Sequence, residues 1–124
     1  MKINDPEILR EVEAAFARYE AALISNDVAV LDALFWSDDR TVRFGATENL
    51  YGHAEILAFR QARPSKNLDR ELRNTVITTF GDNTASATSE FVRPGETRIG
   101  RQSQTWVRVE GNWRIVAAHV SWMV

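Results

Sequence analysis

The N-terminal part of the chain repeats apolar side chains at steps of three and four residues. The repeating positions are Ile8, Leu9, Val12, Ala15, Phe16, Tyr19, Ala22 and Leu23. This spacing predicts a long amphipathic helix with one buried stripe. Asp5 followed by Pro6 is typical of an N-cap and a first helical residue, and we expect the helix to end near Ser25–Asn26.

Shorter elements follow. Asp27 can cap a second helix that carries Val28, Leu31 and Leu34, and 36–39 is typical of a turn. A short strand is expected over Thr41–Phe44, and an irregular connection over Gly45–Gly52. A third helix is predicted over His53–Ala62, because Pro64 disfavours helical geometry at the preceding residue.

The C-terminal half alternates between apolar and polar residues, which predicts strands. The expected strands are Leu68–Phe80, Thr84–Arg93, Ile99–Val109 and Trp113–Met123, the last two forming a hairpin around 110–112. Helices followed by a strand meander predict an α+β fold, with a cone-shaped, curved antiparallel sheet of four strands covered by three helices. We find no repeat or linker, so residues 1–124 are expected to form a single domain.

The last predicted strand is apolar on both sides. Strict alternation puts Trp113, Ile115, Ala117, His119 and Ser121 on one side, and Arg114, Val116, Ala118, Val120 and Trp122 on the other. A sheet with two apolar faces favours helices on one face and a second subunit on the other. We therefore expect a homodimer that forms through the outer face of the sheet.

Composition narrows the class of protein. The chain has 124 residues with 44% hydrophobic and 26% charged residues, which suits one soluble domain. It has no apolar run of roughly 20 residues and no cysteine, and its N-terminus lacks an apolar core like that of a signal peptide, so we expect a cytoplasmic protein without membrane contact. A net charge of −2 gives no electrostatic case for nucleic acid. All basic residues except Lys2 and Lys66 are arginines, which suit carboxylate recognition, although a codon bias explains such an excess equally well.

Tyr19 and Arg43 are polar residues in apolar surroundings. Tyr19 lies on the buried stripe of the first predicted helix, and Arg43 interrupts a β-rich run. On pattern alone, a core tyrosine and a solvent-facing arginine are the simpler interpretation. If both reach one cavity, a phenol and a guanidinium can bind and polarise a small carboxylated substrate. A covered Arg43 would need an anion, either Glu48 or a bound carboxylate.

Other polar residues are candidates for a pocket floor. His119 and Ser121 share one face of the last strand, and the hairpin places His119 near Gln102 or Gln104. A structural histidine is an equally good interpretation. The two histidines lie in no metal-ligand spacing, and the chain has no glycine-rich phosphate loop, nucleophile elbow or dinucleotide motif. We therefore expect no metal or cofactor, and any catalysis by ordinary polar side chains.

Several segments together resemble a known family. The ending Gly111–Ser121 is similar to the closing strand of the nuclear transport factor two-like superfamily, which has a cystatin-like fold and includes ketosteroid isomerases and SnoaL-type cyclases. The segments Thr41–Gly45, Glu48–Gly52 and Gly100–Trp106 resemble the AtzH-like proteins, also called HpxZ or oxalurate-catabolism proteins. The similarity extends from about Asp5 to Met123.

The resemblance implies a function. AtzH-like proteins are dimers assigned to cyanuric acid breakdown, and are thought to act as amidohydrolases on 1,3-dicarboxyurea, yielding allophanate for the next enzyme. The pair proposed as catalytic in the family, a tyrosine on the first helix and an arginine on the first strand, corresponds to Tyr19 and Arg43 here. His119, Gln104 and Asn49 are expected to orient the substrate.

Two other functions are compatible with the sequence. The cavity can bind an acidic metabolite without turnover, or the domain can dock on a partner amidase. An isomerase or cyclase of the SnoaL type would need a carboxylate base, for which Glu48 and Glu90 are the candidates.

Overall fold

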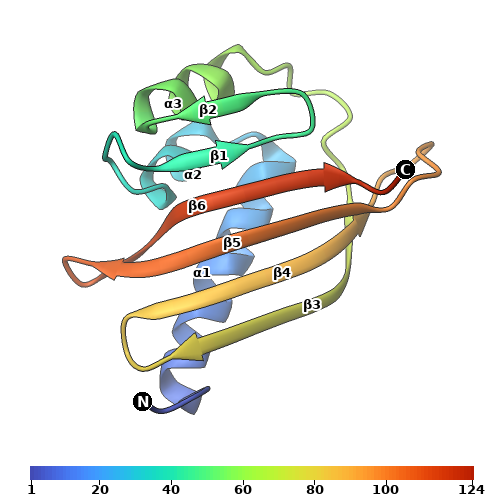
Figure 1. Cartoon of the computed structure of the whole chain (residues 1–124). Coiled ribbons are helices and arrows are strands. Elements are labelled where there is room, and N and C mark those ends of the chain that lie inside the picture. Colours follow the sequence, from blue (N-terminus) through green and yellow to red (C-terminus); the bar gives the residue numbers. More distant parts are fainter.

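Three helices cover one face of a curved six-stranded sheet in the computed structural model, which describes all residues 1–124 (Figure 1). The helices are α1 (Pro6–Ser25), α2 (Val28–Leu34) and α3 (His53–Ala62). The strands are β1 (Val42–Phe44), β2 (Asn49–Tyr51), β3 (Glu71–Phe80), β4 (Thr84–Val92), β5 (Gly100–Val109) and β6 (Asn112–Trp122), in the order β2-β1-β6-β5-β4-β3. The predicted α+β class is confirmed, but the sheet has six strands where four were predicted.

The helix ends follow the predicted capping residues. The Asp5 carboxylate accepts a hydrogen bond from the Glu7 backbone at 3.0 Å, and α1 ends at Asn26 in the left-handed conformation. The Asp27 carboxylate accepts one from the Val30 backbone at 3.2 Å and so caps α2. These side chains satisfy backbone groups that a helix end leaves without partners. None of the helices is both long and apolar enough to cross a membrane.

The predicted irregular connection over Gly45–Gly52 is wrong in part, because it contains β2. The Gly45 backbone donates to the Glu48 carbonyl at 2.8 Å and closes a tight turn. This turn lets β2 pair with β1 in antiparallel register, and β1 in turn lies parallel to β6. The two short strands thus extend the meander along the free edge of β6.

The C-terminal strands lie close to their predicted bounds, with one exception. β3 begins at Glu71 and not at Leu68, since Glu71 pairs with Val92, the last residue of β4. The residues before Glu71 therefore have no ladder partner. The bounds of β4, β5 and β6 agree with prediction to within one residue.

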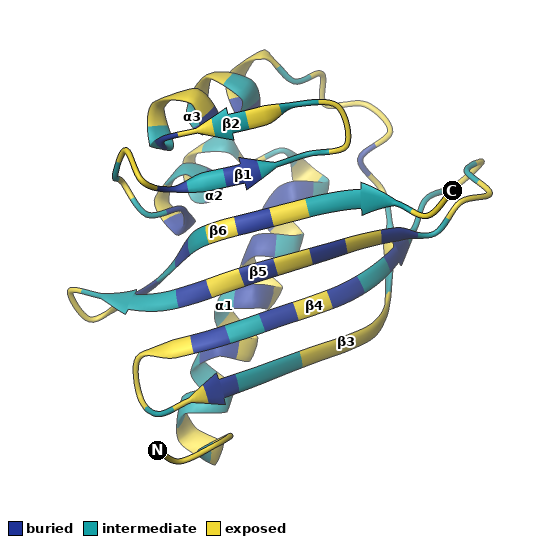
Figure 2. Ribbon diagram, viewed as in Figure 1, coloured by how far each residue is buried: buried dark blue, intermediate teal, exposed yellow.

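A bulge in β6 overturns the predicted faces of this strand. Ile115 pairs with Trp106 and Ala117 pairs with Thr105, so that Val116 has no partner. The extra residue reverses the alternation. Ala118 is consequently buried, whereas Ala117 and His119 are exposed on the outer face. Figure 2 shows the regular alternation of buried and exposed residues along β5 for comparison.

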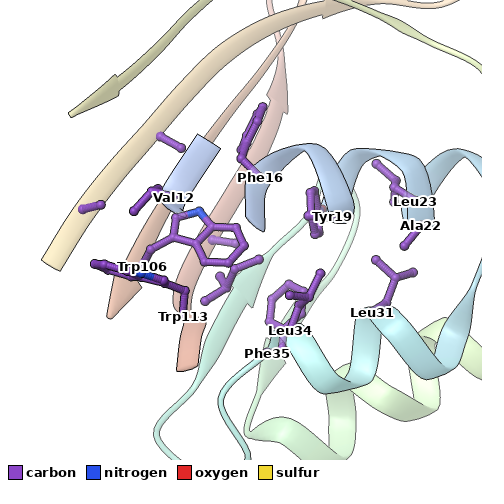
Figure 3. Close-up of a cluster of buried hydrophobic side chains, with 14 of the residues drawn as sticks. Val12, Phe16, Tyr19, Ala22, Leu23, Leu31, Leu34, Phe35, Trp106 and Trp113 are labelled. Atoms are coloured by element: carbon purple, nitrogen blue, oxygen red, sulfur yellow. The ribbon is translucent and has the colours of Figure 1, made fainter. Parts of the chain in front are cut away.

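The core lies between α1 and the inner face of the sheet. Val12, Phe16 and Tyr19 of α1 pack against Trp106 and Ile115, among other buried residues (Figure 3). The outer face is less apolar than predicted. Its central part carries polar side chains beside the apolar Val42, Phe44 and Ala117: Ser86, Thr88, Ser103, Thr105 and His119. The homodimer stays a prediction, and its premise of two apolar faces is met only in part.

Candidate functional site

Tyr19 and Arg43 line one cavity of about 240 Å³, which lies between α1, α3, the β1–β2 turn and the inner face of the sheet and is open on one side. Tyr19 comes from the buried stripe of α1. Arg43 faces inward because its neighbours Val42 and Phe44 face outward, in register with Ala117 and His119. The prediction that both residues reach one cavity is confirmed, and their catalytic roles stay predictions.

Arg43 is buried, and its guanidinium is hydrogen-bonded through Nη1, while Nε has no partner. It is 5% exposed, and its Nη1 donates to Glu48 Oε1 at 3.0 Å. The guanidinium carbon lies 5.0 Å from the centre of the Phe59 ring. Nε is buried and has no hydrogen-bond partner within the chain. A guanidinium with donors left over is suited to bind a further anion.

Glu48 is fixed by two neighbours. Thr47 donates to Glu48 Oε2 from its hydroxyl at 2.6 Å and from its backbone at 3.3 Å. Partial burial raises the pKa of this carboxyl, but the hydrogen bonds from Thr47 and Arg43 outweigh burial and hold the pKa below its ordinary value of 4.5. A side chain at Gly45 would collide with the Glu48 carboxylate. Gly45 is therefore needed for the ion pair of Glu48 and Arg43.

Tyr19 is a buried phenol among cations. It is 2% exposed, and its ring meets the Phe35 ring edge to face at a centroid distance of 6.2 Å. Burial opposes ionisation and is the largest single influence. The charges of Arg60, Arg70 and Arg43 together outweigh it and hold the pKa of Tyr19 below the ordinary value of 10.0. The phenol is thus a stronger acid than a tyrosine in water.

Arg70 forms one fixed wall of the cavity. Its Nε and Nη2 donate to the two Glu20 carboxylate oxygens at 2.7 and 2.6 Å, and Nη2 also donates to Gln102 Oε1 at 2.8 Å. The guanidinium lies 4.5 Å from the centre of the Phe91 ring. These contacts leave Arg70 little freedom, so it supplies a positive charge at a set position.

Arg63 and Arg93 line the same cavity without a carboxylate partner. Arg93 Nη1 donates instead to the backbone carbonyls of Asn67 and Asp69, at 3.1 and 3.4 Å. Burial is the main cause that lowers the pKa of both groups, followed by the charge of Arg43 for Arg63 and of Arg70 for Arg93. Their charges are therefore poorly compensated within the chain.

Arg60 is a further buried cation that the sequence analysis missed. It is 1% exposed and lies behind the cavity wall, and burial is the main cause that lowers its pKa to about 10. Its position four residues after the buried Ile56 in α3 is the sequence pattern that could have revealed it. Around the cavity, five arginines face two glutamates, an excess of three positive charges: Arg43, Arg60, Arg63, Arg70 and Arg93 against Glu20 and Glu48.

The other predicted site residues lie elsewhere. His119 and Ser121 face outward beyond the β6 bulge, with His119 opposite Ser103. Asn49 is exposed on β2. Gln104 is buried on the inner face, where its side chain accepts a hydrogen bond from the Trp106 indole at 3.0 Å. The predicted pocket floor of His119, Ser121 and a glutamine is wrong, because the β6 bulge turns His119 and Ser121 to the face opposite Gln104. Asn49, predicted to orient the substrate, does not line the cavity either.

The two carboxylates considered as isomerase bases lie on different sides of the sheet. Glu48 lines the cavity but is paired with Arg43, whereas Glu90 lies on the outer side of β4 and accepts from Asn74 at 2.9 Å. Neither is a carboxylate facing a large apolar pocket. The structure has no group of three or more histidine, cysteine, aspartate or glutamate side chains that could hold a metal ion.

Known proteins similar to this chain agree with its architecture. A family model described as AtzH-like matches residues 1–124. None of the curated proteins matches. The structure is similar to that of a DUF3225-family protein of unknown function from Pectobacterium atrosepticum, with 64% identity and a TM-score of 0.97 over 98% of this chain and 95% of that one.

Two further structures extend the likeness. A cystatin-like fold protein from Burkholderia xenovorans is 42% identical, with a TM-score of 0.96 over 100% of this chain and 98% of that one. An NTF2-like protein of unknown function from Pseudomonas putida is 17% identical, with a TM-score of 0.77 over 94% and 87% of the two chains, and so shows the fold alone. The predicted cystatin-like, nuclear transport factor two-like fold is confirmed.

Proposed function

The chain belongs to the AtzH-like family, and we propose that it is an amidohydrolase that converts a small carboxylated urea of the 1,3-dicarboxyurea type to allophanate. One observation carries the proposal. A buried phenol that can donate a proton, Tyr19, lines a small cavity in which guanidinium groups outnumber carboxylates. This arrangement suits a small dianionic substrate whose nitrogen must receive a proton when its bond to a carboxyl carbon is cleaved.

The charge of the cavity favours a substrate with two carboxylates. Arg43 has donors free for one carboxylate, and Arg63 and Arg93 supply uncompensated charge for the other. Guanidinium groups match the planar geometry of carboxylates. The cavity volume of about 240 Å³ suits a compact ligand and not a steroid-sized one.

The chemical step needs a proton donor at the leaving nitrogen. The bond between one terminal carboxyl carbon and its nitrogen breaks, and the electron pair goes to the nitrogen. Tyr19 gives its proton to this nitrogen and regains one from the water that adds to the departing carboxyl carbon. The dicarboxyurea dianion and water thus become the allophanate anion and bicarbonate. Direct loss of carbon dioxide would need the same proton from Tyr19.

The test is the release of allophanate with and without protein, at several protein concentrations, because dicarboxyureas also break down spontaneously. A rate that rises in proportion to protein and falls in a Tyr19→Phe variant supports the proposal. A rate independent of protein, combined with a ligand-induced rise in melting temperature, would favour the alternative that the cavity only binds an acidic metabolite. That alternative is favoured by the same excess of arginines.

We also propose a homodimer that forms through the outer face of β4, β5 and β6. This face is hollowed around Val42, Phe44 and Ala117 and carries hydroxyl groups at Ser103 and Thr105. Sedimentation of the wild type and of a Thr105→Arg variant tests the dimer, since a dimer that survives this charge does not use this face. A partner amidase that takes the product on is a further proposal, which co-purification from cells tests.

A further inference from the structure

Arg60 is a buried charge without a carboxylate partner. Its side chain is 1% exposed, and its Nε, Nη1 and Nη2 atoms all lack a well-aligned hydrogen bond within the chain. Burying an ionised group in this way is costly, since both the charge and the donors lose water. Unpartnered buried donors of this kind are rare in folded proteins and therefore call for an explanation.

The surroundings of Arg60 contain one group that can become its anion. The guanidinium carbon lies 5.7 Å from the Phe35 ring centre and 5.9 Å from that of Phe59. Tyr19 packs on the same Phe35 ring from α1, and Arg60 is close enough to interact with its hydroxyl. The other charged groups that act on Arg60 are cations, Arg43 on β1 and Arg63 at the end of α3.

We propose that Arg60 is a positioning residue that stabilises the Tyr19 phenolate formed when Tyr19 passes its proton to the leaving nitrogen of the substrate. This role rests on the proposed function. As the Tyr19 O–H bond breaks and the N–H bond forms, negative charge appears on the Tyr19 oxygen. Arg60 offers that oxygen a nearby positive charge and donors that no other group of the chain occupies, until a proton returns from water. Preorganised donors of this kind act where charge develops in the reaction.

Arg60 acts through Tyr19 and not on the substrate directly. It does not line the cavity, whereas Arg43, Arg63, Arg70 and Arg93 do. Loss of Arg60 should therefore change the ionisation of Tyr19 but leave anion binding intact. Loss of Arg63 should weaken anion binding and shift the ionisation of Tyr19 less than loss of Arg60 does, because Arg63 acts on Tyr19 through its charge alone. Arg63 is therefore the matched comparison.

The chain allows a direct measurement because it has only two tyrosines, Tyr19 and the 57% exposed Tyr51. Tyrosine ionisation is followed by phenolate absorbance, or by NMR of labelled tyrosine rings, in the wild type, Arg60→Met, Arg60→Lys and Arg63→Met. A Tyr19→Phe variant identifies the Tyr19 signal. We expect Tyr19 to ionise at a pH about one unit higher or more in Arg60→Met, with partial recovery in Arg60→Lys. Malonate, a dianion that does not react, should bind these two variants with wild-type affinity and Arg63→Met more weakly.

The readout is independent of turnover, so its failure is distinguishable from failure of the proposed function. An unchanged Tyr19 titration in Arg60→Met, or malonate binding lost as in Arg63→Met, would overturn the role of Arg60. Wild-type protein without turnover would defeat the proposed amidohydrolase, whatever the titration gives. The melting temperature of Arg60→Met should be no lower than that of the wild type, since the variant removes an uncompensated charge. If Arg60→Met does not fold, the titration of Arg60→Lys tests the role instead, and a Tyr19 titration identical to that of the wild type would contradict it.

Discussion

Arg43 Nη1 donates to Glu48 Oε1 at 3.0 Å, and this contact ties the first strand to the turn that follows it. The ion pair orients one edge of the guanidinium and leaves the buried Nε without a partner. Glu48 is held in turn by Thr47. The site therefore contains Arg43 as a catalytic candidate, Glu48 as the residue that orients it, and the turn at Gly45 that positions Glu48. Each of these three parts can be changed by a separate substitution.

Removing the Tyr19 hydroxyl should abolish turnover without unfolding the protein. Tyr19→Phe keeps the ring that packs on Phe35 but removes the proton donor. We expect kcat to fall about a hundredfold or more, with little change in malonate affinity. Steady-state kinetics and calorimetry measure the two quantities, with Tyr51→Phe as the control. Near-normal kcat in Tyr19→Phe would remove this residue from the mechanism.

Replacing Arg43 by lysine should show whether its planar donors matter. A lysine keeps the charge but offers a point-like ammonium in place of a fork of donors. We expect kcat/KM to fall about a hundredfold, while the melting temperature changes by only a few degrees. Arg40→Lys, at a site where the arginine side chain is 78% exposed, should leave kcat/KM unchanged. Equal activity of both variants would contradict a bidentate role.

The Gly45→Ala variant tests the anchor without touching a charged residue. The added carbon would collide with the Glu48 carboxylate and lie close to Arg43 Nη1. Glu48 must then move, and Arg43 loses its orientation. We expect kcat/KM to fall tenfold or more, because the activation free energy rises by about 1.4 kcal/mol for each factor of ten. Gly95→Ala is the control, because the added carbon would meet no neighbour there. The backbone of Gly95 is left-handed, with φ at 79°, and that of Gly45 is not, so Gly95→Ala also shows how far backbone strain alone lowers kcat/KM.

The sequence predicts most of the fold because its main elements depend on local patterns. The Asp5–Pro6 cap, the stripe through Tyr19 and the strand alternation are visible without any long-range contact. The β6 bulge at Val116 depends on how β6 pairs with β5, and no glycine or proline marks it. Because of this one unpaired residue, His119 and Ser121 lie on the outer face and not in the predicted pocket.

The site was predictable to a smaller extent. Tyr19 and Arg43 stood out as polar residues in apolar stretches, and the family resemblance supported them. Arg60, Arg63, Arg70 and Arg93 converge from α3, the segment before β3 and the end of β4, so their meeting depends on tertiary packing. The spacing of Arg60 from Ile56 was the one local indication of burial.

The pH dependence of the rate should report the ionisation of Tyr19. As a general acid, Tyr19 must carry its proton, so the rate falls when the pH rises through its pKa. Neighbouring arginines hold this pKa below 10.0, and we expect the alkaline fall of kcat/KM to begin below pH 10. A bound dianion offsets these cations, so the fall of kcat should occur at higher pH than that of kcat/KM. A profile that stays flat through pH 10 would exclude Tyr19 as the acid.

Arg63 should allow the protein to distinguish dianions from monoanions. The cavity has more cationic charge than Glu20 and Glu48 offset, and Arg63 has no carboxylate partner there. A second carboxylate on the ligand gives this charge a partner, whereas acetate leaves it uncompensated. Malonate at a hundred times its Kd should stabilise the fold by about 2.7 kcal/mol, which a melting curve detects as a shift of several degrees.

The Arg63→Met variant should weaken malonate binding about tenfold, or roughly 1.4 kcal/mol, and leave the weaker acetate binding nearly unchanged. Arg101→Met on the exposed side of β5 is the matched control, since it removes the same charge from a residue that does not line the cavity. A loss of malonate affinity equal in both variants would indicate attraction by overall charge. A loss confined to Arg63→Met would assign the second carboxylate to this side of the cavity, where the product, left with one carboxylate, is bound less tightly and can leave.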